Sequence, residues 1–493
     1  MTTRRDMLLL LGGAAAWAQR PARPQPPKPN FIVIFADDLG YGDLACYGSA
    51  RNATPHLDRM AAEGALFTDF YVPMPFCAPS RSALLTGRYP FRTTITGNPA
   101  PDSGINELAL PPAEVTIAEV LKPLGYATSI LGKWHLGHQA TTLPRSQGFD
   151  EYYGIPYSND MRPVQLVENE TVVEYPVAQS ELTRKYTERA LAFLDRNKAR
   201  PFFLYLPHAM PHKPLAASQD FYTKGDPANL YAAVIAELDW SVGQILAKLK
   251  ALGLDDNTLV LFTSDNGATF GGSTGGLRGM KGSPFEGGVR VPLLARWPGR
   301  IPAGLRTGEI AGVIDILPTL AALAGAPLPA GRTIDGKNIF GLMTTPRAPS
   351  PHEALFVMSG AKLSAIRMGP WKLHVRPPGP GLAGGIPDPD RYIDPRGPDG
   401  VTILAPYEQA RPTMHPGVTT GDPARENMLF HLATDPAEQR DVAAAHPDLV
   451  AKMRDRFTRM ENQVGPPRLD RGWGGVKVLK GGELRYDRLA KTP

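Results

Sequence analysis

The amino-acid sequence predicts an α/β fold, in which helices cover a parallel sheet, followed by a smaller α+β domain. Short, uninterrupted apolar runs end abruptly in polar or charged residues, as expected of strands that are buried on both faces. Helical patterns lie between these runs, and a proline-rich stretch near residue 345 leads into a region of different character. The chain of 493 residues is long enough for one large and one small domain.

Four apolar runs are the predicted strands of the large sheet: residues 30–36, 127–131, 201–206 and 259–262. Helices are expected between them at about 116–124, 183–197 and 230–252. In open α/β sheets, ligands gather at the carboxyl ends of the strands. The polar residues at those ends are Asp37 and Asp38, Lys133 and His135, His208 and His212, and Asp265 and Asn266. We therefore expect these side chains to share one pocket.

The acidic side chains among them predict a metal site. Asp37, Asp38 and Asp265, together with Asn266, offer only oxygen ligands. Such a set suits a hard cation, calcium or magnesium, rather than zinc. Taken alone, each pair would more readily be interpreted as a turn at a strand end, because Asp and Asn favour such positions. Two pairs at strand ends, with Cys77 between them in the chain, favour the metal site.

The smaller domain is predicted after a linker at residues 344–351. Strand-like segments at 355–358, 363–367 and 371–375, a loop-rich stretch at 377–423 and a helix at about 447–463 indicate an α+β domain built on a short antiparallel sheet. Asp435-Pro436 is assigned to a turn. The predicted division is a leader with its linker at 1–29, a catalytic domain at 30–345 and a smaller domain at 346–493.

The first 29 residues have the pattern of an export signal followed by a proline-rich linker. Arg4 and Arg5 precede an apolar stretch, residues 7–18, that ends in Ala16-Trp17-Ala18. This is typical of a twin-arginine signal peptide with its cleavage site. The stretch is much shorter than the roughly 20 residues that a membrane span needs. We expect the twin-arginine translocase to export the protein to the periplasm or the outside of a bacterium, with no stable membrane span.

Charge and cysteine content exclude two classes of protein. Most of the formal net charge of +5 comes from the first 30 residues, which hold Arg4, Arg5, Arg20, Arg23 and Lys28 against Asp6. The rest is close to neutral and has no Lys/Arg run, so a nucleic-acid partner is not expected. Cys46 and Cys77 are the 2 cysteines, which is too few for a disulfide scaffold.

Cys77-Ala78-Pro79-Ser80-Arg81, followed by Leu85-Thr86-Gly87-Arg88, is the most specific motif of the chain. At these residues the sequence resembles the sulfatase family, the formylglycine-dependent, arylsulfatase A-like enzymes of the alkaline phosphatase superfamily. A short pattern can arise by chance, and Cys77 alone could be a buried structural thiol. Other blocks of the family follow in order as far as about Val442, which favours the resemblance. It implies an alkaline-phosphatase-like fold, with a mixed, mostly parallel sheet between helices.

The resemblance also implies a chemistry. A formylglycine-generating enzyme would oxidise Cys77 to a formylglycine, whose hydrate carries two hydroxyl groups. One hydroxyl attacks sulfur and expels the alcohol; deprotonation of the other then releases sulfate and restores the aldehyde. One metal ion per chain, Ca²⁺ with Mg²⁺ as the alternative, would be bound by Asp37, Asp38, Cys77, Asp265 and Asn266.

Further roles are carried over by resemblance to residues that match family blocks. Arg81 would orient the formylglycine, and Lys133, Ser158 and Lys281 would bind sulfate, with Lys281 also helping the alcohol leave. His135 would remove a proton, and His212 would contact the ester oxygen and protonate the leaving group. His208, close to His212 in the chain, has a structural role as its alternative.

The expected function is therefore hydrolysis of a sulfate monoester of an aryl or carbohydrate alcohol. Because the substrate is an anion, attack on it requires charge neutralisation and an activated nucleophile. A phosphonate or phosphodiester hydrolase of the same superfamily is one alternative, and a non-catalytic carbohydrate-binding relative is another. The second is disfavoured because no catalytic position is lost. Specificity for the alcohol is expected in the loops at 98–110, 161–179 and 377–423.

Overall fold

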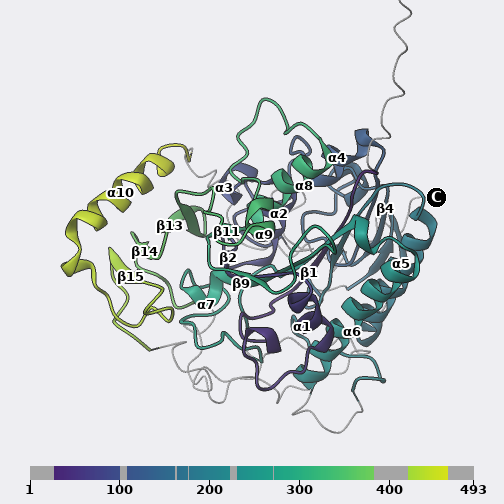
Figure 1. Ribbon diagram of the computed structural model, residues 1–493, viewed down its shortest axis with the longest axis horizontal. Coiled ribbons are helices and arrows are strands. Elements are labelled where there is room, and N and C mark those ends of the chain that lie inside the picture. Colours follow the sequence, from purple (N-terminus) through teal and green to yellow (C-terminus); the bar gives the residue numbers. More distant parts are fainter. Residues whose placement is uncertain are drawn as a thin grey trace, which may run out of the picture.

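A computed structural model of the protein describes residues 27–99, 108–161, 164–175, 177–222, 230–269, 271–381 and 420–464. Residues 1–26 of the predicted leader and most of the loop-rich stretch 377–423 lie outside the described residues. The described chain forms a large sheet of 11 strands and a separate sheet of 4 strands, which lies to the left in Figure 1. The predicted fold, a mostly parallel sheet between helices with a small antiparallel sheet, is confirmed.

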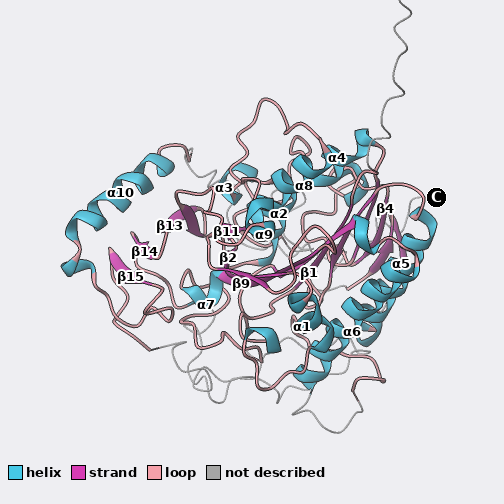
Figure 2. Ribbon diagram, in the orientation of Figure 1, coloured by secondary structure: helices cyan, strands magenta, loops and turns pink. Residues whose placement is uncertain are grey.

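The centre of the large sheet consists of the four predicted strands, β1 (Asn30–Ala36), β3 (Ala127–Leu131), β7 (Phe202–Pro207) and β8 (Thr258–Ser264). β1 lies between β7 and β8, β3 lies beyond β7, and all are parallel. Every residue of these strands is buried, because helices cover both faces of the sheet (Figure 2). Their carboxyl ends therefore meet at one edge.

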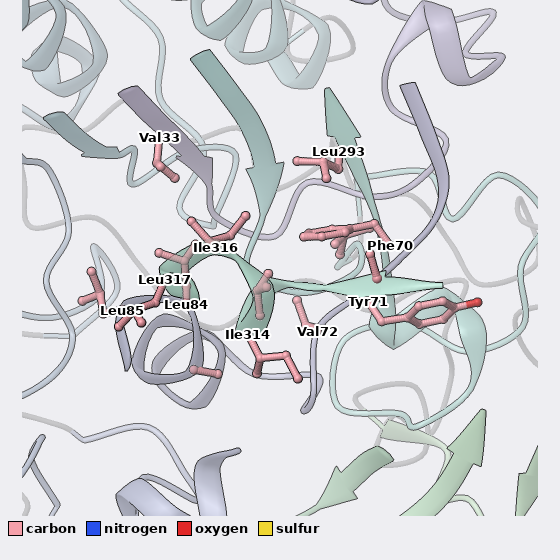
Figure 3. Packing of buried hydrophobic residues seen from close by; sticks show 14 of the residues in the cluster. Val33, Phe70, Tyr71, Val72, Leu84, Leu85, Leu293, Ile314, Ile316 and Leu317 are labelled. Atoms are coloured by element: carbon pink, nitrogen blue, oxygen red, sulfur yellow. The ribbon is translucent and has the colours of Figure 1, made fainter. Parts of the chain in front are cut away.

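Two layers of helices cover the sheet. One face packs against α1 (Pro55–Ala62), α5 (Leu182–Asn197) and α6 (Leu230–Ala251), and the other against α2 (Cys77–Thr86), α4 (Ile117–Leu121) and α8 (Ile316–Ala324). Figure 3 shows Leu84 and Leu85 of α2 and Leu317 of α8 gathered beside the strands that carry Val33 and Leu293. Among the described residues, α6 is the one helix that is long and apolar enough to span a membrane. Of its apolar stretch of 18 residues, 67% is buried inside the protein.

Several strands and short helices were not predicted from the sequence. β9 (Arg290–Arg296) pairs antiparallel with both β8 and β2 (Ala65–Tyr71), which makes the sheet mixed. The remaining elements of the large sheet and its connections are β4 (Glu151–Gly154), β5 (Leu166–Glu168), β6 (Thr171–Glu174), β10 (Leu305–Thr307), β11 (Ala311–Gly312), α3 (Pro90–Thr93), α7 (Glu286–Val289) and α9 (Phe340–Thr344). β9 follows the short helix α7 and the loop that carries Lys281.

The small sheet is antiparallel, as predicted. Its strands, in order, are β12 (Leu355–Ser359), β13 (Lys362–Met368), β14 (Trp371–His374) and β15 (Met428–His431), and α10 (Pro447–Glu461) follows in the chain. Leu355, Ile366 and Phe457 belong to the same buried apolar cluster as Phe67 and Leu293 of the large sheet. The small sheet is therefore firmly packed against the large one. The predicted division of the chain at residue 345 stays a prediction.

Candidate active site

The carboxyl ends of β1 and β8 bring the predicted metal ligands together. The register pairs Ala36 with Ser264, so the residues that follow them lie side by side. The Asp38 backbone N–H donates to Asp265 Oδ1 at 3.1 Å, and Asn266 Nδ2 donates to Asp38 Oδ1 at 2.7 Å. Asp38 has a φ of 64°, a left-handed conformation that costs about 1 kcal/mol for a non-glycine residue. The contacts with Asp265 and Asn266 therefore hold the Asp38 backbone in this conformation.

Arg81 and Lys133 lie against these carboxylates. Arg81 Nη2 donates to Asp37 Oδ2 at 3.2 Å and to Asp265 Oδ2 at 2.8 Å, so one guanidinium bridges the ends of β1 and β8. Its Nη1 donates to the Lys133 carbonyl oxygen at 2.9 Å. Lys133 Nζ forms an ion pair with Asp37 and donates to Ser158 Oγ at 3.0 Å. The ends of β1, β3 and β8 are therefore tied to one another through buried charged groups.

Lys281 completes the cationic side of the site. Its Nζ lies 2.7 Å from Asp38 Oδ1. Burial alone would raise the pKa of Asp37, but the charges of Lys133, Arg81 and Lys281 outweigh it, so that pKa is lowered. Burial and the neighbouring Asp37 charge raise the pKa of Asp265 to about 7. The site holds three carboxylates and three cations, Asp37, Asp38, Asp265, Arg81, Lys133 and Lys281, each at most 5% exposed.

Cys77 is the first residue of α2, and its Sγ lies 3.5 Å from Asp37 Oδ1. Burial, followed by the charge of Asp37, raises the pKa of this thiol far above its usual value. The unmodified side chain is therefore a neutral thiol. At the N-terminus of a ten-residue helix, residue 77 also faces the positive end of the helix dipole, which favours negative charge there.

Two of the predicted histidines have defined tautomers. His135 Nε2 lies 3.0 Å from the Pro99 carbonyl oxygen; because a carbonyl can only accept, Nε2 carries the proton and Nδ1 the lone pair. That Nδ1 is buried and has no hydrogen-bond partner among the described residues. Burial, then the charges of Lys133 and other cations, hold the pKa of His135 well below its usual value, so the ring is neutral. His135 Nδ1 is therefore available as a base.

His212 and His208 differ in their surroundings. His212 Nδ1 lies 2.6 Å from the Lys213 carbonyl oxygen, which places its proton on Nδ1, and its Nε2 is 3.5 Å from Asp38 Oδ2. His208 lies on the α5–α6 side, with Nε2 3.4 Å from Ser241 Oγ. Burial lowers the pKa of His208 to about 3. These contacts favour the structural alternative for His208.

The donor set fits a hard cation. Ligand atoms of Asp37, Asp38, Cys77 and His212 lie within 4.8 Å of one another. Asp38 Oδ2 and Asn266 Oδ1 are buried without a hydrogen-bond partner among the described residues, which costs about 1–3 kcal/mol each unless a ligand pairs with them. His212 joins this group although the sequence assigned it to proton transfer, while Asp265, a predicted ligand, faces Arg81. The residues can hold a metal.

Two contacts of the site were missed by sequence reasoning. Asn98 Oδ1 accepts from the Ala78 backbone N–H at the start of α2, at 3.0 Å, and the next residue, Pro99, binds His135. This short loop thus touches both the helix of Cys77 and the predicted base. It has no periodic pattern, and an isolated Asn carries no signal for a remote helix cap.

Fold and site together define an α/β enzyme whose buried cations and carboxylates are arranged around Cys77. The Sulfatase family model matches residues 29–326, and the model for the C-terminal region of aryl-sulfatase matches residues 350–477. The chain belongs to the sulfatase family and is a sulfatase, an enzyme that acts on sulfate esters.

Several relatives share most of the chain. Arylsulfatase A of Homo sapiens is 41% identical over 76% of this chain and 78% of its own length. Steryl-sulfatase of Mus musculus is 35% identical over 85% of this chain and 79% of its own length. N-acetylgalactosamine-6-sulfatase of Sus scrofa is 39% identical, over 76% of each chain.

Solved structures agree in fold. The structure of Ps i-CgsB is 31% identical with a TM-score of 0.72 and covers 90% of this chain and 94% of its own. A Bacteroides thetaiotaomicron structure from work on the metabolism of multiple glycosaminoglycans is 29% identical with a TM-score of 0.72, over 89% of this chain and 100% of its own. A phosphonate monoester hydrolase of Agrobacterium radiobacter, 17% identical with a TM-score of 0.59, covers 89% of this chain and 96% of its own and shares the fold alone.

Proposed function

We propose that this sulfatase cleaves sulfate monoesters of an aryl or carbohydrate alcohol, using a formylglycine made from Cys77 and one divalent metal ion, calcium rather than magnesium. The names of the relatives support this substrate range, since they include a steryl-sulfatase, an arylsulfatase and an N-acetylgalactosamine-6-sulfatase. A similar structure, Ps i-CgsB, is complexed with a neocarrahexaose.

The observation that carries the proposal is the position of Cys77 Sγ among ligand atoms of Asp37, Asp38 and His212, within 4.8 Å of one another. A bound dication would favour the ionised forms of Asp37, Asp38 and Asp265, whose charges then balance those of the three cations. The occupied site would therefore be positive and suited to an anionic ester. When bound, the ion would neutralise sulfate charge and lower the pKa of the nucleophile. Asp37, Asp38, Asp265, Asn266 and residue 77 would hold it.

The chain's own residues supply the remaining steps. Lys133, Ser158 and Lys281 hold sulfate oxygens while one hydroxyl of the hydrated formylglycine forms a bond to sulfur. The attacking hydroxyl passes its proton to Asp37, whose Oδ1 lies 3.5 Å from Cys77 Sγ. The ester S–O bond breaks, and His212, which enters this step protonated on both ring nitrogens, donates its Nε2 proton to the departing alcohol. His135 Nδ1 then takes the proton of the second hydroxyl, the C–O bond to sulfate breaks, and the aldehyde returns. Arg81 holds residue 77 in place for both halves.

Mass spectrometry of the peptide that contains residue 77 tests the mechanism. A formylglycine weighs about 18 Da less than the cysteine from which it is made. We expect activity to rise in proportion to the modified fraction when a formylglycine-generating enzyme is co-expressed. Fully active protein with an unmodified thiol would overturn the proposal.

The phosphonate or phosphodiester hydrolase alternative is tested with matched esters. Purified enzyme is assayed on the sulfate monoester, the phosphate diester and the phosphonate monoester of the same phenol. We expect kcat/KM to be highest for the sulfate. All three esters carry one negative charge, so the comparison reports on the group that is transferred and not on the charge of the substrate. A preference for the phosphoryl compounds would instead support the alternative.

We also propose that the twin-arginine leader exports the protein to the periplasm or cell exterior, and that the chain divides near residue 345. The gap between the two matched family models, residues 327–349, supports that division. Replacing Arg4 and Arg5 by lysine is expected to retain the enzyme in the cytoplasm, as measured by cell fractionation. Unchanged export of the double variant would contradict the proposal.

A further inference from the structure

The loop that carries Lys281 is held from outside by the small C-terminal sheet. We name residues 278–286 the lysine loop. At its start, Arg278 donates from Nη1 to the Glu438 carbonyl oxygen at 2.9 Å and from Nη2 to the Asp422 carbonyl oxygen at 2.8 Å. The Arg278 guanidinium also stacks over the Phe285 ring at 4.1 Å. One arginine thus fastens both ends of the loop to segments that flank β15.

The end of the lysine loop meets three buried polar residues of the small sheet and of the turn that follows it, which we name the C-terminal clamp: Lys372, His374 and Glu438. Lys372 Nζ donates to the Pro284 carbonyl oxygen and to Glu286 Oε1, both at 2.9 Å. Glu438 Oε2 accepts from the Glu286 backbone N–H at 2.5 Å, and its Oε1 pairs with His374 at 2.6 Å. The clamp therefore binds the loop through both backbone and side chain.

On its inner side the lysine loop has little freedom to move. The Lys281 N–H donates to the Ala268 carbonyl oxygen and the Gly282 N–H to the Pro75 carbonyl oxygen, both at 2.9 Å. A Cβ added at Gly287 would lie 2.2 Å from the Gly279 carbonyl oxygen, so the two ends of the loop are in close contact. A displacement of either end would therefore move the Lys281 backbone.

We propose that Glu438 and Lys372 are positioning residues for the sulfatase reaction, because they fix the lysine loop and thereby place Lys281 Nζ beside Asp38 and the bound sulfate. This inference rests on the role proposed for Lys281. A lysine side chain has several rotatable bonds, so only a fixed backbone and a fixed partner define where its charge lies. A misplacement of about 1 Å can reduce the rate about 100-fold. The small sheet thus contributes to catalysis without touching substrate.

The test combines Glu438→Gln with Lys281→Ala in a double-mutant cycle. Glu438→Gln keeps the shape of the side chain and removes its charge. We expect kcat/KM on aryl sulfates to fall about 10- to 100-fold, as for other residues that orient a group in direct contact with substrate. Because Lys281 is proposed to assist the leaving alcohol, the loss should be larger for phenols of high pKa than for 4-nitrophenol. In the Lys281→Ala background, Glu438→Gln should cause no further loss.

The matched control is Asp239→Asn, which removes the charge of another buried carboxylate. That carboxylate accepts hydrogen bonds from the backbone N–H groups of His56 and Leu57. The substitution should lower the melting temperature without changing the dependence of kcat/KM on leaving-group pKa. All variants are compared at equal formylglycine content and well below their melting temperatures. If Glu438→Gln does not fold, Arg278→Met takes its place in the same cycle.

The outcomes separate this inference from the proposed function. An unchanged kcat/KM in Lys281→Ala would overturn the role proposed for Lys281, and this inference with it. A second outcome would overturn this inference alone. In it, Lys281→Ala greatly lowers kcat/KM, and Glu438→Gln lowers kcat/KM by the same factor with or without Lys281 and to the same extent for every leaving group. Loss of the Glu438 effect in the Lys281→Ala background supports it.

Discussion

The protein buries acidic and basic side chains in two clusters. The active-site cluster, at the carboxyl edge of the large sheet, consists of Asp37, Asp38, Asp265, Arg81, Lys133 and Lys281. The interface cluster, between the two sheets, consists of Glu286, Arg290, Arg367, Lys372, His374 and Glu438. Both are removed from water, so each must balance the desolvation of its charges with partners inside the protein.

The clusters differ in how their carboxylate oxygens are satisfied. In the interface cluster, Glu286 Oε1 accepts from Lys372 and Oε2 from the Tyr71 hydroxyl at 2.8 Å, and both oxygens of Glu438 are also bonded. In the active-site cluster, Asp38 Oδ2 has no hydrogen bond among the described residues, and Asp38 has a left-handed backbone. An unsatisfied carboxylate oxygen on a residue with a strained backbone indicates a place for a ligand.

Cys77→Ala should give the largest effect and separate the clusters most clearly. We expect turnover to fall at least about 10⁴-fold, because the proposed nucleophile is lost, while the melting temperature changes little. Lys372→Met should show the reverse pattern, with a loss of about 3–5 kcal/mol in the free energy of unfolding and a smaller loss of turnover. Steady-state kinetics and thermal unfolding of both variants measure the contrast. Substantial turnover by Cys77→Ala would mean that another group is the nucleophile.

Calcium should stabilise the protein through the active-site cluster alone. A ligand at 100 times its Kd adds about 2.7 kcal/mol to the free energy of unfolding of the protein that binds it. We expect the melting temperature of chelated wild-type protein to rise on addition of Ca²⁺, and activity to return with it. The shift should persist in Glu286→Gln and be lost in Asp38→Asn. An equal shift in Asp38→Asn would place the ion elsewhere.

Acid should weaken the interface cluster through Glu286. Burial would raise the pKa of Glu286, but Lys372, Arg290 and Arg367 together lower it from 4.5 to about 2. Its stabilising effect is therefore complete above about pH 4.5 and is lost as the pH falls towards 2. We expect the stability difference between wild type and Glu286→Gln to shrink by about 3 kcal/mol over this interval, measured by urea unfolding. A difference that stays constant would show that Glu286 is not ionised in the folded protein.

The sequence predicted the centre of the fold because buried parallel strands are short, apolar runs with abrupt polar ends. β1 and β3 have the predicted bounds, and β7 and β8 differ from the prediction by one or two residues at each end. The same runs predicted which side chains would lie together, and Asp37, Asp265 and Cys77 do lie together. The catalytic and metal-binding roles of these residues stay predictions.

Other elements could not be predicted from local pattern. All residues of α2 are buried, so the helix has no polar face to give a period of 3.6 residues, and it contains Pro79 near its start. The antiparallel strand β9 pairs with β2 and β8 in the large sheet. β2 is far from β9 in the sequence, so the local pattern of β9 does not indicate this pairing. Glu438 follows a predicted turn at Asp435-Pro436, and nothing in that turn indicates a partner as distant as Glu286.

The smallest predicted effect concerns the helix that carries residue 77. Phe76 precedes α2 and has no polar side-chain atom, and Pro79 has no N–H, so Asn98 Oδ1 serves as a remote cap for the Ala78 N–H. Asn98→Ala should reduce the free energy of unfolding by about 1 kcal/mol. kcat/KM should fall a few-fold, because the first turn of α2 carries residue 77, the proposed nucleophile.

Asn98→Asp distinguishes capping from other roles of this side chain. It keeps an acceptor for the Ala78 N–H and places a negative charge at the positive end of the helix, so stability should be retained. The same charge lies close to the site of an anionic substrate, so KM should rise. If Asn98→Ala and Asn98→Asp lose equal stability, the side chain acts by packing and not as a cap. If only Asn98→Ala loses stability, the start of α2 beside the active-site cluster requires a hydrogen-bond acceptor for the Ala78 N–H.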